Sequence, residues 1–293
     1  LLRRRLIRLS LANQVSSYGP TRFTVVDQGP RNGPDVILLP GLTSSRAVWD
    51  TEGARLKGNY HLHLVQVNGF GDQPAGVNAT PGDLLPAIVD QLHEYIATRH
   101  MHPVVVGHSL GGLMGLMLAQ KYPEDLSKLV VVDALPFIGL MFGPQATVAS
   151  TTTAARTMRD GMLTQTLEQR AAMEKHTAET LALTLQGRER IVADGLASDP
   201  KVVAEATFAD FQTDLRPALA TISTPTLVLY AFDPTLVFPG GTKPTQALAD
   251  SITANAYKDM PNVTLVRVDN SRHFIMYDQP ETFAKTVEAF IRF

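Results

Sequence analysis

The sequence predicts an α/β protein with a mostly parallel central sheet, helices on both faces and an inserted helical cap. Short, continuous apolar runs at residues 36–39 and 104–106 are typical of strands buried on both faces. These runs alternate with segments of helical spacing, an order that favours parallel strands joined by right-handed crossovers. The alternation lapses once, over residues 135–219, and then resumes, which indicates an insertion into one sheet.

The first half of the chain supplies the predicted strands in which alternation or burial is clearest. Residues 22–26 alternate and are rich in β-branched side chains, and a Gly-, Pro- and Asn-rich turn follows them at 27–34. The further strands are 36–39, 61–67 and 104–106. The predicted helices run from a cap at Ser44 or Ser45 to about residue 56, over 81–99, and from 110 to about 122.

The second half resumes the pattern after the insertion. Strands are predicted at 129–132, 226–230 and 263–268, with a helix at 245–256 and a last helix that begins at Pro280. We therefore divide the chain into a peripheral segment (1–17), a core (18–134 and 220–293) and a helical cap (135–219). An insertion at this point would lie over the carboxyl ends of the strands, where open α/β sheets bind ligands.

Composition excludes several kinds of site. The formal net charge is −2, so there is no general basic excess of the kind that nucleic-acid binding needs. The absence of cysteine excludes disulfides, thiolate metal ligands and a cysteine nucleophile. No apolar run is long enough to span a bilayer. The Arg- and Leu-rich start fits a leader remnant or a surface helix, so cytoplasm and export both stay open, as does the oligomeric state.

The strongest chemical signal is Gly107-His108-Ser109-Leu110-Gly111, between a buried strand and a helix of small residues. A sharp turn there would hold the serine in a strained conformation with its hydroxyl exposed. Side chains at 107 or 111 would collide with neighbouring backbone, which explains both glycines. The N–H groups at the start of the following helix would point at developing negative charge.

With this pentapeptide the chain resembles the α/β-hydrolase superfamily, and most closely its bacterial capped serine esterases. The resemblance extends from about Phe23 to the end and is weakest in the cap. It implies the chain order serine, acid, histidine. It also implies an oxyanion hole made by the backbone N–H groups of Leu110 and of Leu42, although the usual His-Gly of that loop is Pro40-Gly41 here.

His273 is the histidine that fits this order, because it lies in a loop between the last predicted strand and the closing helix. His108 stands within the pentapeptide and is expected to line the wall beside the serine. His176 lies in the predicted cap. The other histidines precede the serine and do not fit the order: His61, His63, His93, His100 and His102.

The acid has more than one candidate. Asp233 follows the strand at 226–230 and is our first choice, although the glycine usual in the family shortly before this acid is missing. Asp133, at the end of the strand at 129–132, is the main alternative, because some lipases place their acid there. Asp269 is a third candidate.

The expected activity is hydrolysis of a small-molecule carboxylic ester through an acyl-enzyme, without a cofactor. Phe137 and Met141, at the apolar entry to the cap, are expected to form a pocket wall with His108 that prefers short-to-medium apolar acyl groups. The same triad acting on lactones, carbon–carbon bonds, perhydrolysis or acyl transfer is the alternative, and a non-catalytic receptor a remote one. No metal site is expected, because His61 and His63 have no third ligand nearby in sequence.

Overall fold

The computed structural model describes residues 19–80, 82–237, 241 and 243–292, so the peripheral segment predicted for residues 1–17 lies outside the described residues. Within these ranges a seven-stranded sheet has the order β1-β3-β2-β4-β5-β6-β7. Strand β1 is antiparallel to β3 and the remaining pairs are parallel, so the prediction of a mostly parallel sheet is confirmed. The strands are β1 Phe23–Gln28, β2 Asp35–Leu39, β3 His61–Val67, β4 Val104–His108, β5 Lys128–Val132, β6 Thr226–Phe232 and β7 Val263–Asp269.

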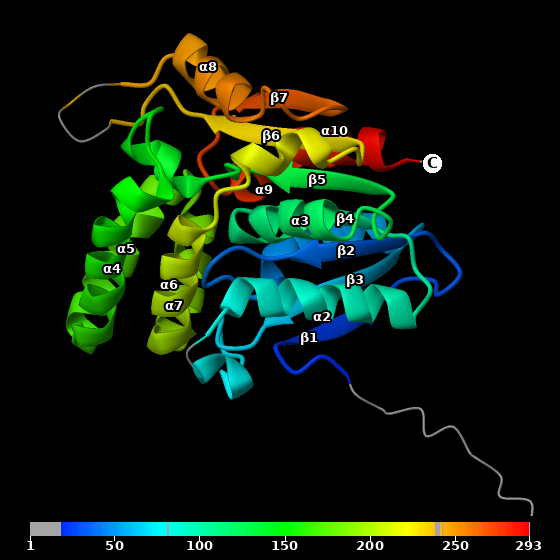
Figure 1. Cartoon of the computed structure of the whole chain (residues 1–293), viewed down its shortest axis with the longest axis horizontal. Coiled ribbons are helices and arrows are strands. Elements are labelled where there is room, and N and C mark those ends of the chain that lie inside the picture. Colours follow the sequence, from blue (N-terminus) through cyan, green and yellow to red (C-terminus); the bar gives the residue numbers. More distant parts are fainter. Residues whose placement is uncertain (1–18, 81, 238–240, 242, 293) are drawn as a thin grey trace, which may run out of the picture.

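Helices cover both faces of this sheet (Figure 1). One face carries α2 (Leu84–Thr98), α3 (Leu110–Lys121) and α8 (Gln246–Ala256). The other carries α1 (Asp50–Leu56), α9 (Ile275–Asp278) and α10 (Pro280–Ile291). Short 3₁₀ turns η1 (Arg46–Trp49), η2 (Gly76–Ala79), η3 (Ile138–Phe142) and η4 (Arg216–Thr221) complete the connections. Among the described helices, none is both long and apolar enough to cross a membrane.

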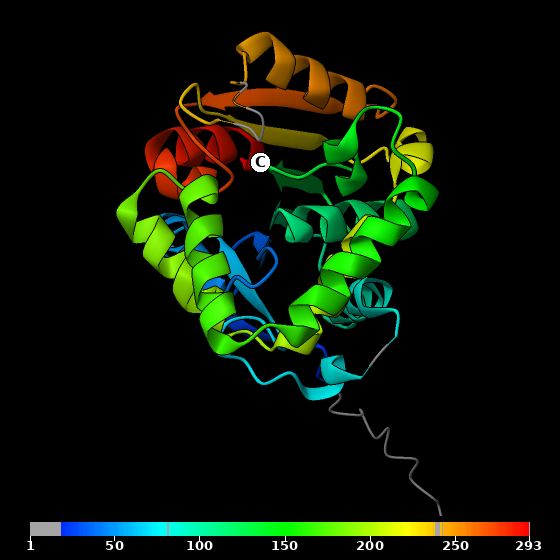
Figure 2. The ribbon, with the colours of Figure 1, turned by 90° about the vertical axis from the view of Figure 1, so that its left-hand side faces the viewer.

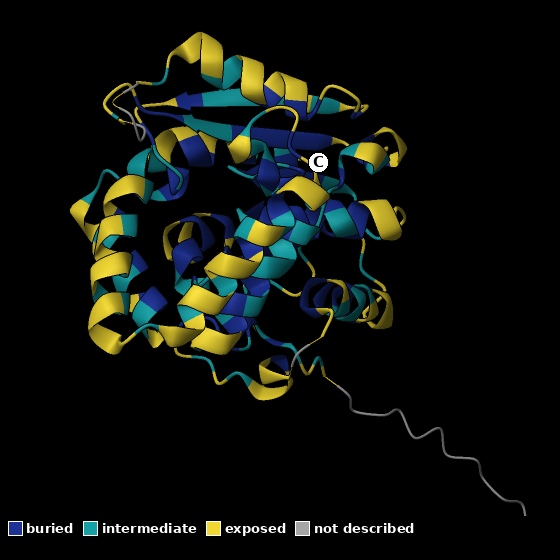
Figure 3. Ribbon diagram, turned by 60° about the vertical axis from the view of Figure 1, so that its left-hand side comes forward, coloured by how far each residue is buried: buried dark blue, intermediate teal, exposed yellow. Residues whose placement is uncertain are grey.

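The period-2 alternation of strands divides the apolar core between the two faces. In β2, Ile37 and Leu39 pack toward α2 and α3, whereas Val36 and Leu38 pack toward α1 and α10. The central strands are therefore buried on both sides, while the outward faces of the surrounding helices are exposed (Figure 3). This two-sided burial fixes the positions of the strands. The residues that follow them, among them Ser109, Asp133 and Asp233, are therefore held in fixed positions.

Four helices connect β5 to β6 and stand beside the carboxyl ends of the parallel strands (Figures 1 and 2). They are α4 (Val148–Thr164), α5 (Leu167–Leu181), α6 (Leu185–Ala197) and α7 (Pro200–Gln212). Each begins at a side-chain cap, provided in turn by Thr147, Thr166, Thr184 and Asp199. Helix α4 packs against α7 and α5 against α6, so the four form two antiparallel pairs.

Ser45 joins these helices to the core instead of capping the helix that follows it. The structure makes Ser45 the N-cap of η1, but its side chain makes no capping bond. Its hydroxyl and its backbone N–H both donate to Oδ2 of Asp194 in α6, at 2.7 and 2.9 Å. The expected capping by Ser45 is therefore wrong, because a buried carboxylate of α6 takes both donors.

Candidate active site

Ser109 lies at the turn between β4 and α3 in a strained backbone conformation, with φ of 53° and ψ of −121°. Its N–H donates to the Val132 carbonyl at 2.9 Å, which anchors the turn to β5. A Cβ at Gly107 would lie 2.2 Å from the Gly111 carbonyl oxygen, and one at Gly111 would lie 2.4 Å from the Leu39 oxygen. The two glycines are therefore required by close approach of backbone to backbone.

The loop after β2 passes directly over this turn. A Cβ at Gly41 would lie 2.9 Å from Nδ1 of His108 and 3.1 Å from Cβ of Ser109, so the loop approaches the serine as closely as a glycine allows. Leu42 and Thr43 line a cavity together with Ser109. The N–H of Leu42 makes no hydrogen bond within the described ranges, and that of Leu110 is the first of its helix, where no intrahelical acceptor exists.

His273 lies between β7 and α9, and its Nδ1 is 2.7 Å from Oδ2 of Asp133. Asp133 follows β5 with a φ of 47°, and its other oxygen accepts from the N–H of Ala231 at 2.8 Å. Since a carboxylate only accepts, His273 carries its proton on Nδ1 toward Asp133. The free electron pair of the imidazole is then on Nε2, the atom that a general base uses.

Asp233, our first choice for the acid, binds a different partner. Its Oδ2 accepts from Nε of Arg272 at 2.6 Å, and its Oδ1 accepts from both the N–H and the hydroxyl of Thr235. Burial opposes ionisation, but these hydrogen bonds outweigh it and hold the pKa of Asp233 below its usual value. The predicted contact of Asp233 with His273 is therefore wrong, because the neighbouring guanidinium engages this carboxylate and Asp133 contacts the imidazole.

His108 packs against His273 and lines one of the two cavities together with Ser109. It is completely buried, and its Nε2 donates to the carbonyl of His273 at 3.0 Å. Burial lowers the pKa of His108 well below the usual value, and the charge of His273 acts in the same direction. His108 is therefore neutral, and its hydrogen bond fixes the backbone of His273.

Two cavities, of about 610 and 550 Å³, meet at the same residues. Ser109, Leu181 and His273 line both of them. The first extends toward β6 and α8, and its apolar lining includes Leu113, Leu135, Ile138, Met141, Leu236 and Ile252. The second lies beneath α4 and α5, and its apolar lining includes Met158, Met162, Met173, Ile191, Val203 and Phe274.

Met141 and Phe137, the two pocket residues predicted at the entry to the cap, lie in different surroundings. Met141 lines the first cavity. Phe137 does not, since it is fully buried and its ring packs beneath the guanidinium of Arg216, 4.6 Å from the ring centre. A Cβ at Gly139 would lie 2.2 Å from this ring, so the tight turn after Phe137 encloses it. The prediction of Phe137 as a pocket wall is therefore wrong.

Asp210 is a cavity residue that sequence reasoning missed. It lies in α7, lines the first cavity and makes no side-chain hydrogen bond or ion pair with any other described residue. Burial raises the pKa of Asp210 to about 7, although the charge of His273 acts in the opposite direction. It stands in an amphipathic helix without a motif, so the sequence contains no local signal that would single it out.

The chain is similar to known proteins in sequence and in fold. A family model described as the alpha/beta hydrolase family matches residues 36–286. Two curated relatives are pimeloyl-[acyl-carrier protein] methyl ester esterases. The Aeromonas salmonicida protein is 26% identical over 259 residues, and the Nitrosomonas europaea protein is 28% identical over 261. Each alignment covers 88% of this chain and 96% of the relative. A solved esterase from Exiguobacterium antarcticum has the same fold, with a TM-score of 0.75, 19% identity, and coverage of 92% and 96% of the two chains.

Proposed function

The chain belongs to the alpha/beta hydrolase family, and we propose that it is a serine esterase with Ser109 as nucleophile, His273 as general base and Asp133 as the acid that orients the imidazole. One observation carries the proposal. The imidazole held by Asp133 at 2.7 Å and the strained Ser109 line the same two cavities. In this proposal Asp133 takes the place of Asp233, which the sequence favours as the acid of the triad. The esterase relatives support the reaction type.

In the proposed reaction, Oγ of Ser109 attacks the ester carbonyl carbon while Nε2 of His273 takes the hydroxyl proton. The imidazolium then gives this proton to the leaving alkoxide, and the alcohol departs from an acyl-enzyme. Water attacks the acyl carbon with His273 again as base, and the carboxylic acid leaves as Ser109 regains its proton. Throughout, Asp133 stabilises the imidazolium and does not itself become protonated.

The tetrahedral intermediates carry a negative oxygen that needs donors. The N–H groups of Leu42 and Leu110 are the proposed oxyanion hole, because neither donates to an acceptor within the described part of the chain and both residues line the cavities at Ser109. Each such donor contributes about 3–4 kcal/mol to transition-state stabilisation. The close approach at Gly41 brings the Leu42 loop to this position.

The substrate proposed for this site is a carboxylic ester with apolar groups on both sides of the ester bond. Two separate cavities meet at Ser109, so the acyl chain and the alcohol can occupy one each. Most of the surface that lines both cavities is apolar, and the thioethers of the second adapt to different shapes. Short-to-medium acyl groups fit these volumes. The relatives act on a methyl ester of a protein-bound pimeloyl chain, which is consistent with a small alcohol and an extended acyl group.

The test combines a panel of esters with labelling of the serine. The wild-type protein is expected to hydrolyse aryl esters of short-to-medium acyl chains, and a serine-directed phosphonate is expected to modify Ser109 once per chain. Ser109→Ala should abolish turnover and labelling with an unchanged unfolding temperature, whereas Ser251→Ala, an exposed serine of α8, should change neither. Full activity in Ser109→Ala, or a label on another residue, contradicts the proposal.

A further inference from the structure

A cluster of histidine and aspartate side chains lies at the opposite edge of the sheet from Ser109. His61 and His63 are two residues apart in β3, so both project from the same face. The antiparallel register places Asp27 of β1 directly opposite His63, and the parallel register places Asp35 of β2 directly opposite His61. Sheet pairing therefore collects four residues from three strands at one edge, which neighbouring positions in sequence do not reveal.

Asp35 fixes the tautomers of both rings. Its Oδ1 accepts from Nδ1 of His61 at 2.8 Å and from Nε2 of His63 at 3.0 Å. Because a carboxylate only accepts, each imidazole carries a proton on the nitrogen that faces Asp35. The remaining nitrogens, Nε2 of His61 and Nδ1 of His63, then carry lone pairs. A carboxylate that holds the far nitrogen of a histidine is the usual arrangement behind a metal-binding imidazole.

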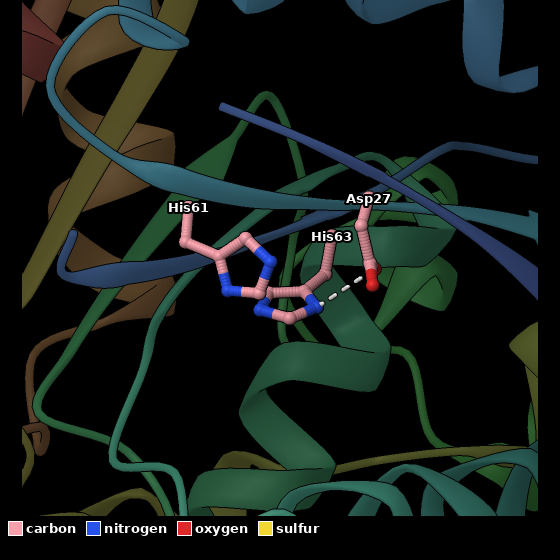
Figure 4. A group of neighbouring side chains, drawn as sticks. All are labelled: Asp27, His61 and His63. Atoms are coloured by element: carbon pink, nitrogen blue, oxygen red, sulfur yellow. Dashed lines mark ion pairs between the residues drawn. The ribbon is translucent and has the colours of Figure 1, made fainter. Parts of the chain in front are cut away.

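Of these two lone pairs, that of His63 has a hydrogen-bond partner among the described residues and that of His61 has none. Nε2 of His61 is buried and has no hydrogen-bond partner among the described residues. Nδ1 of His63 accepts from the Tyr95 hydroxyl at 2.9 Å and also lies 3.3 Å from Oδ1 of Asp27, a contact between two electron-pair donors that a cation between them would turn into attraction (Figure 4). A buried acceptor without a partner indicates an ion or a water that completes its bonding.

The spacing suits a metal ion. One ligand atom from each of Asp27, His61 and His63 lies within 4.8 Å of those from the other two. Ligand atoms that share a tetrahedral zinc ion at about 2.0–2.1 Å are about 3.4 Å apart, close to the 3.3 Å between His63 and Asp27. Two imidazoles with a carboxylate suit zinc and similar transition metals, whereas magnesium and calcium favour oxygen ligands throughout.

Access and charge agree with this assignment. The His63 side chain is only 1% exposed, but that of Asp27 is 46% exposed, so an ion can enter past Asp27 and keep a water as fourth ligand. The negative charges of Asp27 and Asp35 together balance the charge of a divalent ion. The hydroxyl of Tyr95 lies 2.9 Å from Nδ1 of His63 and also interacts with Asp27, so it can turn to Asp27 when an ion takes the nitrogen.

We propose that Asp27, His61 and His63 form a structural site for a zinc-type divalent ion, with Asp35 positioning both imidazoles. The site ties the edge strand β1 to β3 and, through Asp35, to β2. It lies at the amino ends of β2 and β3, while Ser109 follows the carboxyl end of β4. Its expected effect is therefore on the stability of the sheet and not on catalysis.

The test uses the full chain, stripped with a chelator and titrated with ZnCl₂ by calorimetry. We expect one ion per chain and a higher unfolding temperature with zinc. Asp27→Asn, at a partly exposed position that tolerates an amide, and His61→Ala should each weaken binding at least about tenfold and abolish the thermal shift. His102→Ala, an exposed histidine outside the cluster, is the matched control and should bind as the wild type does.

Binding of Co²⁺ provides a second readout that does not depend on stability. The wild type and His102→Ala should develop the visible absorption of tetrahedral cobalt, and Asp27→Asn should lose it. If the wild type binds no zinc, or if Asp27→Asn and His61→Ala bind zinc as tightly as the wild type, the assignment is wrong. The four side chains are then a hydrogen-bonded network that joins the strands without a metal.

Discussion

Oδ2 of Asp133 lies 2.7 Å from Nδ1 of His273, although the two residues are 140 positions apart in the chain. The contact is fixed from both sides. The Ala231 N–H holds the other oxygen of Asp133 from β6, and His108 holds the carbonyl of His273 from β4. Three neighbouring strands thus position one imidazole, which lines the same two cavities as Ser109.

Replacing Asp133 with Asn is expected to lower kcat by about 10⁴-fold, because an amide that donates to Nδ1 would favour the wrong imidazole tautomer. Asp233→Asn keeps the His273–Asp133 contact and is expected to lower kcat by less than about tenfold. Steady-state kinetics on one aryl ester measures both variants. If Asp233→Asn proves the more damaging change, the acid is Asp233 and the contact with Asp133 is not the catalytic one.

The acid of the triad could not be identified from the sequence alone. The strands and their parallel order follow from apolar runs, and Ser109 and His273 stand out because a motif and a position after the last strand mark them. Asp133 and Asp233 both follow parallel strands at the same edge, so their positions in the chain do not distinguish them. Arg272, next to His273 in sequence, decides between them in space by engaging Asp233. The Asp27–His63 pair depends likewise on an antiparallel register that the strand pattern leaves open.

Asp210 is expected to make stability depend on pH. Its pKa is raised to about 7 in the folded protein by burial, from 3.8 as the ordinary value. Between about pH 4 and 7 the folded state therefore keeps a proton that the unfolded state loses, and this group makes stability fall as pH rises. Asp210→Asn removes that contribution. The gain in unfolding free energy over the wild type should grow from pH 5 to 7, by at most about 1.4 kcal/mol per pH unit, and level off above pH 7.

Urea unfolding of both proteins at several pH values measures this difference. The matched control is Asp259→Asn, which changes an exposed carboxylate. Burial also raises the pKa of Glu52 to about 7, but Glu52 is present in every variant and cancels from the comparison. A gain for Asp210→Asn that does not change between pH 5 and 8 would show that the carboxyl of Asp210 is not protonated in the folded protein at neutral pH.

Removal of metal ions is expected to leave ester hydrolysis unchanged. No proposed step uses a metal, and the histidine–aspartate cluster lies at the amino ends of its parallel strands, at the opposite edge of the sheet from Ser109. Kinetics before and after dialysis against a chelator, well below the unfolding temperature, should give the same kcat and KM. The unfolding temperature of zinc-loaded protein should fall on the same treatment. Loss of activity that a particular metal restores would place a metal in the reaction itself.

Met141 and Phe137 are expected to differ sharply when each is replaced with Ala. Met141 is 74% exposed and lines the first cavity, so its removal should shift the preferred acyl length without loss of turnover on the smallest ester. Each methylene of substrate contributes at most about 0.8 kcal/mol, so kcat/KM should change by no more than about fourfold per carbon.

Phe137 is buried beneath Arg216, and its truncation should lower the unfolding free energy by about 3–5 kcal/mol. The activity of Phe137→Ala on esters of different acyl length, divided by the amount of folded enzyme, should show the same preference as the wild type. A shifted profile in Phe137→Ala together with an unchanged one in Met141→Ala would mean that the acyl chain does not occupy the first cavity.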